Sequence, residues 1–240
     1  MRNKACGPGI LDRRQSLGQP HEHCDQLKKI YCISGLGADH RLFRHIAIPG
    51  HELVPMPNIP HQVTETLASY ASRMAGRIAE KDPILLGVSI GGMIALELGK
   101  VITANKIVII SSAKNSKEVG VRWYLPELLA RYGLVPARWL TVPYSAMLAR
   151  LGAETSAEKQ LLSQMIQESD PQFVKWAIRA VLAWDNTHYP PNIVHLHGTA
   201  DQMIHPKNVR ADYWIEEGSH IMILNKAPEI NRIVAESLSG

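Results

Sequence analysis

The sequence has few cysteines and no long apolar run. Its 240 residues include three cysteines, Cys6, Cys24 and Cys32, whose spacing fits no metal site, and an odd number cannot form a closed disulfide framework. No segment reaches the roughly 18 apolar residues of a membrane span, and the first residues lack the apolar centre of a secretory signal. We therefore expect a cytoplasmic protein with no membrane span.

Clusters of basic residues are also scarce. The net charge is +4 and the pI is about 9.0, but Lys and Arg are spread along the chain, and Arg13-Arg14 and Lys28-Lys29 are the only adjacent pairs. This distribution does not favour a nucleic-acid partner. With 45% hydrophobic and 20% charged residues, the composition is that of an ordinary globular protein, which is compatible with an enzyme.

From Lys29 onward, short β-branched runs alternate with helical patterns. This order predicts an α/β fold in which parallel strands are joined by crossover helices. Most of the runs are apolar throughout, so helices should cover both faces of the sheet. About six strands are expected, over residues 29–34, 52–55, 83–88, 106–111, 192–197 and 211–215. Helices are expected over 64–80 with Thr64 as N-cap, over 90–101 and over 228–238.

One stretch, residues 113–189, interrupts the alternation and is too long for a structureless loop. We expect it to form a helical cap over a core made of residues 28–112 and 190–240. Residues 1–27 are expected to be a mobile N-terminal extension, with an ordered arm as the alternative. Amphipathic patterns predict cap helices over 123–132, 137–151, 156–168 and 171–184.

The clearest motif is Gly87-Val88-Ser89-Ile90-Gly91. It matches the G-x-S-x-G nucleophile elbow and lies where a predicted strand passes into a predicted helix. The serine of such an elbow occupies a tight turn, and the two glycines allow strand and helix to approach without colliding side chains. Ser89 is therefore the candidate nucleophile; the alternative is a glycine turn that only packs a helix on the sheet.

A serine hydroxyl needs a neighbouring base, and histidine suits this role near neutral pH. His220 follows the last predicted strand and should reach the same sheet edge as Ser89. Asp201 follows the fifth predicted strand, and its carboxylate could accept the second imidazole N–H. A turn-forming role is the alternative for Asp201, and Asp185 is the weaker candidate for the acid.

The other histidines are less suited to catalysis. His195 and His197 lie on one face of a predicted strand and could suggest a metal pair, but no third ligand is visible, so packing and local hydrogen bonds are the preferred interpretation. His40, His188 and His205 are expected on the surface. No metal or cofactor is expected.

Acyl transfer also needs donors for the developing oxyanion. The backbone N–H of Ile90, at the start of its helix, should supply one donor. The glycine-rich turn Ser34-Gly35-Leu36-Gly37 follows the first predicted strand and should supply the other, from Leu36. A merely flexible turn is the alternative for this segment.

The chain resembles the α/β-hydrolase superfamily in the order of its serine, aspartate and histidine. It resembles small bacterial carboxylesterases in three segments, Gly35 to Asp39, Gly87 to Gly92 and Trp176 to Trp184. The likeness runs from about Lys29 to the C-terminus. It implies a sheet with the first strand inside the second, and a helical cap inserted after the fourth. The sequence departs in two ways: Ser34 replaces the histidine of a His-Gly pair, and the two antiparallel strands of larger members are missing.

The predicted activity is carboxylic ester hydrolysis through an acyl-enzyme on Ser89, without a cofactor. The substrate should be a small-molecule ester with an apolar acyl part, because the cap holds four of the five tryptophans: Trp123, Trp139, Trp176 and Trp184. These residues could equally pack the cap on its core. Amide, thioester or carbon–carbon bond hydrolysis and a hydrolase-like small-ligand receptor are the alternatives.

Overall fold

The computed structural model describes residues 27–120 and 144–239. The strands are β1 (Lys28–Ile33), β2 (His51–Pro55), β3 (Ile84–Val88), β4 (Lys106–Ile110), β5 (Ile193–Gly198) and β6 (Tyr213–Ile215). The α-helices are α1 (Leu67–Ala75), α2 (Ile90–Leu98), α4 (Tyr144–Leu151), α5 (Ser156–Glu168), α6 (Pro171–Leu182), α7 (Met222–Asn225) and α8 (Ala227–Ser239). The described residues also contain two 3-10 turns, η1 (His40–Phe43) and η3 (Pro206–Asn208).

Six strands form one sheet in the order β2-β1-β3-β4-β5-β6, and all five pairings within the described residues are parallel. The predicted α/β class, the number of strands and the placement of the first strand inside the second are confirmed. Strand ends differ from the prediction by one or two residues, because pairing with the neighbouring strand decides where a strand stops, and the sequence does not contain that information.

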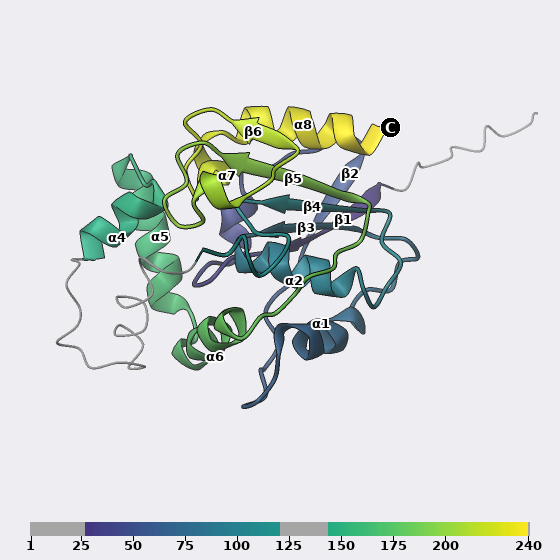
Figure 1. Cartoon of the computed structure of the whole chain (residues 1–240). Coiled ribbons are helices and arrows are strands. Elements are labelled where there is room, and N and C mark those ends of the chain that lie inside the picture. Colours follow the sequence, from purple (N-terminus) through teal and green to yellow (C-terminus); the bar gives the residue numbers. More distant parts are fainter. Residues whose placement is uncertain (1–26, 121–143, 240) are drawn as a thin grey trace, which may run out of the picture.

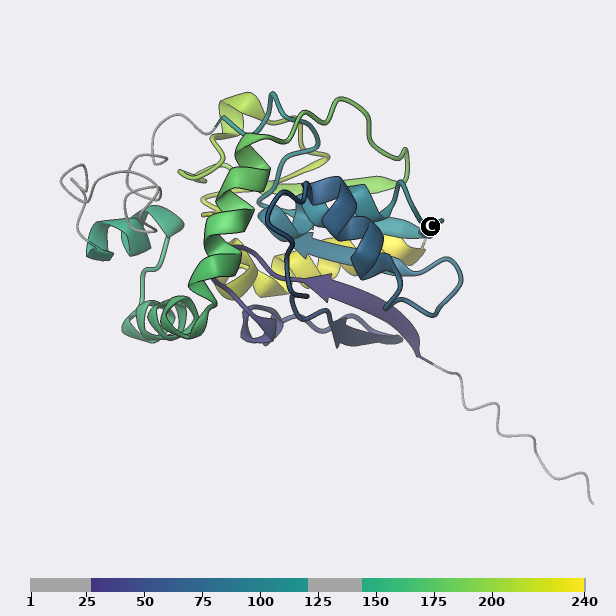
Figure 2. The same cartoon turned by 90° about the horizontal axis from the view of Figure 1, so that it is seen from below.

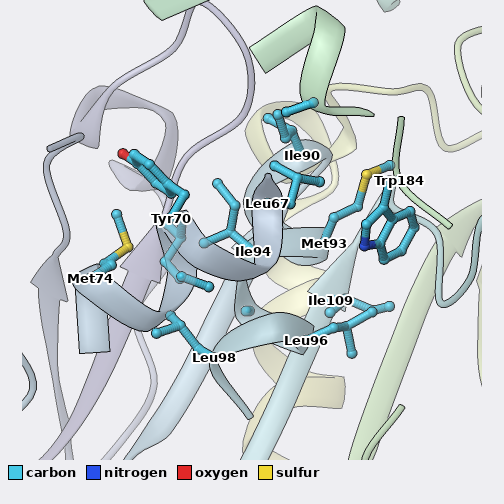
Figure 3. Packing of buried hydrophobic residues seen from close by; sticks show 14 of the residues in the cluster. Leu67, Tyr70, Met74, Ile90, Met93, Ile94, Leu96, Leu98, Ile109 and Trp184 are labelled. Atoms are coloured by element: carbon cyan, nitrogen blue, oxygen red, sulfur yellow. The ribbon is translucent and has the colours of Figure 1, made fainter. Parts of the chain in front are cut away.

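Helices cover both faces of the sheet (Figure 1), with α7 and α8 on one side and α1 and α2 on the other. Side chains of β1 alternate between the two layers: Tyr31 and Ile33 pack with α1 and α2, whereas Ile30 and Cys32 pack with α8. Figure 3 shows the first of these layers. Since both faces are buried, the strands can be apolar throughout, as in Ile84–Val88.

The N-cap of α1 is Thr66, so the prediction of Thr64 is wrong. Thr66 accepts a hydrogen bond from the backbone of Ser69, whose hydroxyl in turn accepts one from the Thr66 N–H. This reciprocal capping box needs a polar side chain three residues after the cap. Residue 67, three positions after Thr64, is a leucine, which cannot complete the pair.

Between β4 and β5 the described part of the chain forms α4, α5 and α6, which lie at the carboxyl ends of the strands (Figures 1 and 2). The predicted helix over 123–132 and the start of the one over 137–151 fall outside the described residues, as do residues 1–26. Thr155 caps α5 and Asp170 caps α6, immediately before a proline at its first position.

Aromatic packing and two indole hydrogen bonds join α6, and Trp184 just after it, to the layer that contains α1 and α2. The Trp176 ring lies 4.6 Å from that of Tyr70 on α1, and its indole N–H donates to the Glu65 carbonyl at 2.8 Å. Trp184 donates to the Glu97 carboxylate on α2, also at 2.8 Å. These tryptophans therefore attach α6 to the core. None of the described helices is long and apolar enough to cross a membrane.

Candidate active site

Ser89 occupies a strained turn between β3 and α2. Its φ of +56° lies in the left-handed region that non-glycine residues rarely adopt. A Cβ on Gly87 would collide with the backbone of Gly91, and one on Gly91 would collide with the Ile33 and Ser34 carbonyls. Only glycine fits at these two positions, as the elbow motif predicts.

Hydrogen bonds on both sides hold the backbone of Ser89. Its N–H donates to the Ile110 carbonyl at 3.0 Å, and the Ser112 hydroxyl donates to the Ser89 carbonyl at 2.7 Å. Sequence reasoning missed Ser112. Its signal was weak, because a serine that follows a neighbouring strand is common and only the strand order brings it beside the elbow.

The structure brings Ser89, His220 and Asp201 into one hydrogen-bonded row. His220 Nε2 lies 3.0 Å from Ser89 Oγ, and His220 Nδ1 lies 2.9 Å from Asp201 Oδ2. Asp201 is 2% exposed and His220 is 7% exposed. The residues come from the ends of β3 and β5 and from the loop after β6, so the parallel sheet delivers all three to its carboxyl edge.

The Asp201 carboxylate is held ionised. Burial opposes its charge, but the attraction of His220, the hydrogen bond from that ring and the backbone N–H of Ile204 together lower its pKa below the usual value. Its Oδ1 accepts from the N–H groups of Met203 at 2.7 Å and Ile204 at 2.9 Å. These bonds leave Oδ2 for His220 and fix the orientation of the carboxylate.

The turn after β1 lies against Ser89. A Cβ placed on Gly35 would be 3.3 Å from Ser89 Cβ and 4.0 Å from Ser89 Oγ. The Ser34 hydroxyl bridges the turn by donating to the Ala38 carbonyl at 2.9 Å, so this serine supports the turn from within. Ile90, the first residue of α2, has a backbone N–H without an acceptor in its own helix.

A cavity of about 150 Å³ opens beside Ser89 and His220, and Leu36 and Ile90 are in its wall. Apart from Ser89 and His220, its described lining is apolar side chains and glycine backbone, from the turn after β1 and from α4, α5 and α6 among others. Trp176 and Trp184 do not line it. The tryptophans that suggested an apolar site instead anchor the helices above it, while Trp123 and Trp139 fall outside the described residues.

The remaining candidates lie elsewhere. Asp185, His40, His188 and His205 are exposed. His195 and His197 are fully buried with ring centroids 5.4 Å apart, and no group of three or more metal-ligating side chains occurs among residues 27–120 and 144–239. Burial raises the pKa of the Cys32 thiol to about 12, which keeps it protonated and unreactive.

Comparison with known proteins agrees with the α/β fold. Residues 26–230 match the family model described as "Alpha/beta hydrolase family". No curated protein sequence matches the chain significantly. Three solved structures, at 12–15% identity, share the fold. An esterase from Thermogutta terrifontis has a TM-score of 0.65 at 15% identity, over 88% of this chain and 89% of that one. An esterase from Exiguobacterium antarcticum has a TM-score of 0.64 at 12% identity, over 89% of this chain and 92% of that one. An enol-lactonase from Burkholderia xenovorans has a TM-score of 0.60 at 15% identity, over 90% of this chain and 92% of that one.

Proposed function

Because the chain belongs to the alpha/beta hydrolase family, we propose that it is a serine hydrolase that cleaves carboxylic esters through an acyl-enzyme on Ser89. The observation that carries this proposal is the row of hydrogen bonds from Ser89 Oγ through His220 to Asp201, at 3.0 Å and 2.9 Å. Both lengths are within the range in which a proton can pass between the groups.

The order of the atoms gives each residue its step. His220 Nε2 takes the Ser89 proton as Oγ attacks the ester carbonyl carbon, and Asp201 stabilises the imidazolium that forms. The bond to the alcohol then breaks, and the alcohol leaves with the proton from His220. Water next gives a proton to His220 and attacks the acyl carbon, and the released Ser89 oxygen regains that proton as the acid departs.

The negative charge on the carbonyl oxygen needs fixed donors during both attacks. We assign these to the backbone N–H groups of Leu36 and Ile90, which belong to the two segments that border Ser89 in the cavity. The N-terminal end of α2 adds its favourable dipole at Ile90. Such donors are preorganised, so they stabilise the transition state without reorganisation.

The apolar wall of the cavity supports an apolar acyl part in the substrate. We propose that residues 113–189 act as a cap on the core of residues 28–112 and 190–240. The cap's α4, α5 and α6 supply lining residues such as Met147, Ile166 and Val181. The cap would then select the acyl group, while the core carries the chemistry.

Fluorophosphonate labelling followed by intact-mass measurement tests the function. Attack of Ser89 on phosphorus displaces fluoride and should leave one adduct on the wild-type protein. His220→Ala should remove the base and, with it, labelling on the same time scale. A folded wild-type protein that forms no adduct would contradict the proposal and favour a ligand receptor on the same fold.

Val181→Phe should change the acyl preference. Val181 lies on α6 in the cavity wall, and a larger side chain there would shorten the space for a chain. We expect kcat/KM for an octanoyl ester to fall about tenfold or more, with that for the acetyl ester changed less than about threefold. Val101→Phe is the matched control, because Val101 is 52% exposed and does not line the cavity. Equal losses for both esters would contradict the assignment of this wall.

A further inference from the structure

Two buried histidines lie behind Asp201 with no part in the reaction described above. His195 and His197 are both on β5 and both 0% exposed. The His197 ring is in edge contact with Trp214 on β6, at a centroid distance of 5.8 Å. A buried imidazole is costly unless its polar atoms are hydrogen-bonded, so the contacts of each ring indicate its purpose.

His197 contacts the turn that carries the acid. Its Nε2 lies 2.9 Å from the Ile204 carbonyl oxygen and 3.6 Å from Asp201 Oδ2. Because a carbonyl oxygen can only accept, the hydrogen must be on Nε2. The Ile204 N–H in turn donates to Asp201 Oδ1. One ring N–H therefore faces both ends of the 201–204 turn.

The electrostatic setting keeps this ring neutral. Burial lowers the pKa of His197, and the opposing attraction of Asp201 does not cancel that effect. The titratable groups that face Asp201 are His220 and His197. A neutral His197 can donate from Nε2 without competing with His220 for the charge of the carboxylate.

We propose that His197 is a positioning residue for the acid: its Nε2–H fixes the 201–204 turn and so aims Asp201 Oδ2 at His220. The inference depends on the proposed serine-hydrolase function, because it assigns a role within that site. His197 would act only through Asp201, since the polar contacts of its ring are with the turn, and it does not line the cavity beside Ser89.

His195 provides a matched control. It lies on the same strand and is equally buried, and within the described residues none of its contacts involves the 201–204 turn. Replacing either histidine by Asn or Gln gives four comparable variants. Glutamine can place an amide N–H near the position of imidazole Nε2, whereas asparagine is one bond too short.

We expect His197→Asn to lower kcat for a simple ester about 10- to 100-fold, because a small displacement of a positioned group has effects of this size. KM should change less than about threefold. His197→Gln should restore kcat to within about fivefold of wild type, and both His195 variants should stay within about threefold.

A double-mutant cycle separates positioning from general destabilisation. In an Asp201→Asn background, His197→Asn should lower kcat by less than a further twofold, roughly, because the two changes act through one group. A full additional loss there, or a kcat loss no larger than that of His195→Asn, would overturn the proposal.

The test must also cover a folding failure of His197→Asn and must distinguish failure of this role from failure of the proposed function. Should His197→Asn fail to fold, a folded His197→Gln with kcat more than about tenfold below wild type would also contradict the proposal. If wild type forms the fluorophosphonate adduct and hydrolyses esters, a negative outcome here rejects only the role of His197. If wild type does neither, the proposed function itself fails.

Discussion

Ser89→Ala is expected to lower ester turnover by roughly 10⁴-fold or more while leaving the fold in place. In the proposed mechanism the substitution removes the atom that forms the acyl-enzyme, which would leave only the weak catalysis of the proposed oxyanion donors and of binding. The Ser89 backbone bonds to Ile110 and Ser112 involve only its N–H and carbonyl, so alanine keeps them. Steady-state kinetics on a simple ester and a thermal unfolding curve measure both parts.

Ser219→Ala is the matched control for that experiment. Ser219 precedes His220 and is buried, yet its hydroxyl has no hydrogen-bond partner in the described part of the chain. Its removal should change kcat less than about threefold. A Ser89→Ala enzyme that keeps near-full turnover, with the same substrate and without contaminating hydrolase, would show that the nucleophile lies elsewhere.

Asp201→Asn should cost about 10⁴-fold in kcat at neutral pH, nearly as much as loss of the nucleophile. An amide can donate to His220 Nδ1, which favours the tautomer whose hydrogen is on Nε2. That ring nitrogen then cannot accept the Ser89 proton at the 3.0 Å contact. Comparing kcat of wild type and Asp201→Asn across pH tests this, and the loss should persist through the neutral range.

Asp185→Asn supplies the comparison, because Asp185 is exposed and was the weaker candidate in the sequence. It should leave kcat within about twofold.

The folding stability of the wild-type protein should also depend on pH, and the direction of this dependence follows from the lowered pKa of Asp201. Its carboxylate contributes to folding stability above the ordinary aspartate pKa of about 3.9, and this contribution is lost as pH falls through the lower folded value. In the kinetic comparison, similar losses of kcat in Asp201→Asn and Asp185→Asn would contradict the proposed role of Asp201.

Much of this architecture was predictable because local patterns and topology agree. Apolar runs such as Ile84–Val88 mark buried strands, and Gly87 and Gly91 mark a turn in which side chains cannot fit. A parallel sheet then brings the residues after each strand to one edge. That rule predicted the meeting of Ser89, Asp201 and His220 from their positions along the chain.

Other features depend on contacts that no local pattern encodes. The bond from Ser112 to Ser89 exists only because β4 is the neighbour of β3. For His197, packing and a local hydrogen bond were the preferred interpretation, but nothing in its sequence surroundings identifies the Ile204 carbonyl as the partner. Trp176 and Trp184 suggested a substrate wall, but their indole N–H groups direct them to Glu65 and Glu97. Polar partners decided where these large side chains lie.

The short outermost strand β6 should make the proposed activity sensitive to local unfolding. Among residues 27–120 and 144–239, its three residues pair only with β5, and Asp201 and His220 lie in the connections on either side of it. Ser89, by contrast, lies 131 residues from His220 along the chain and in the middle of the sheet. Sheet edges open at lower free energy than centres. Under gentle heating or low denaturant, hydrolysis should therefore stop while most of the molecule is still folded. Inactivation would then report local opening at the β6 edge of the sheet rather than global unfolding.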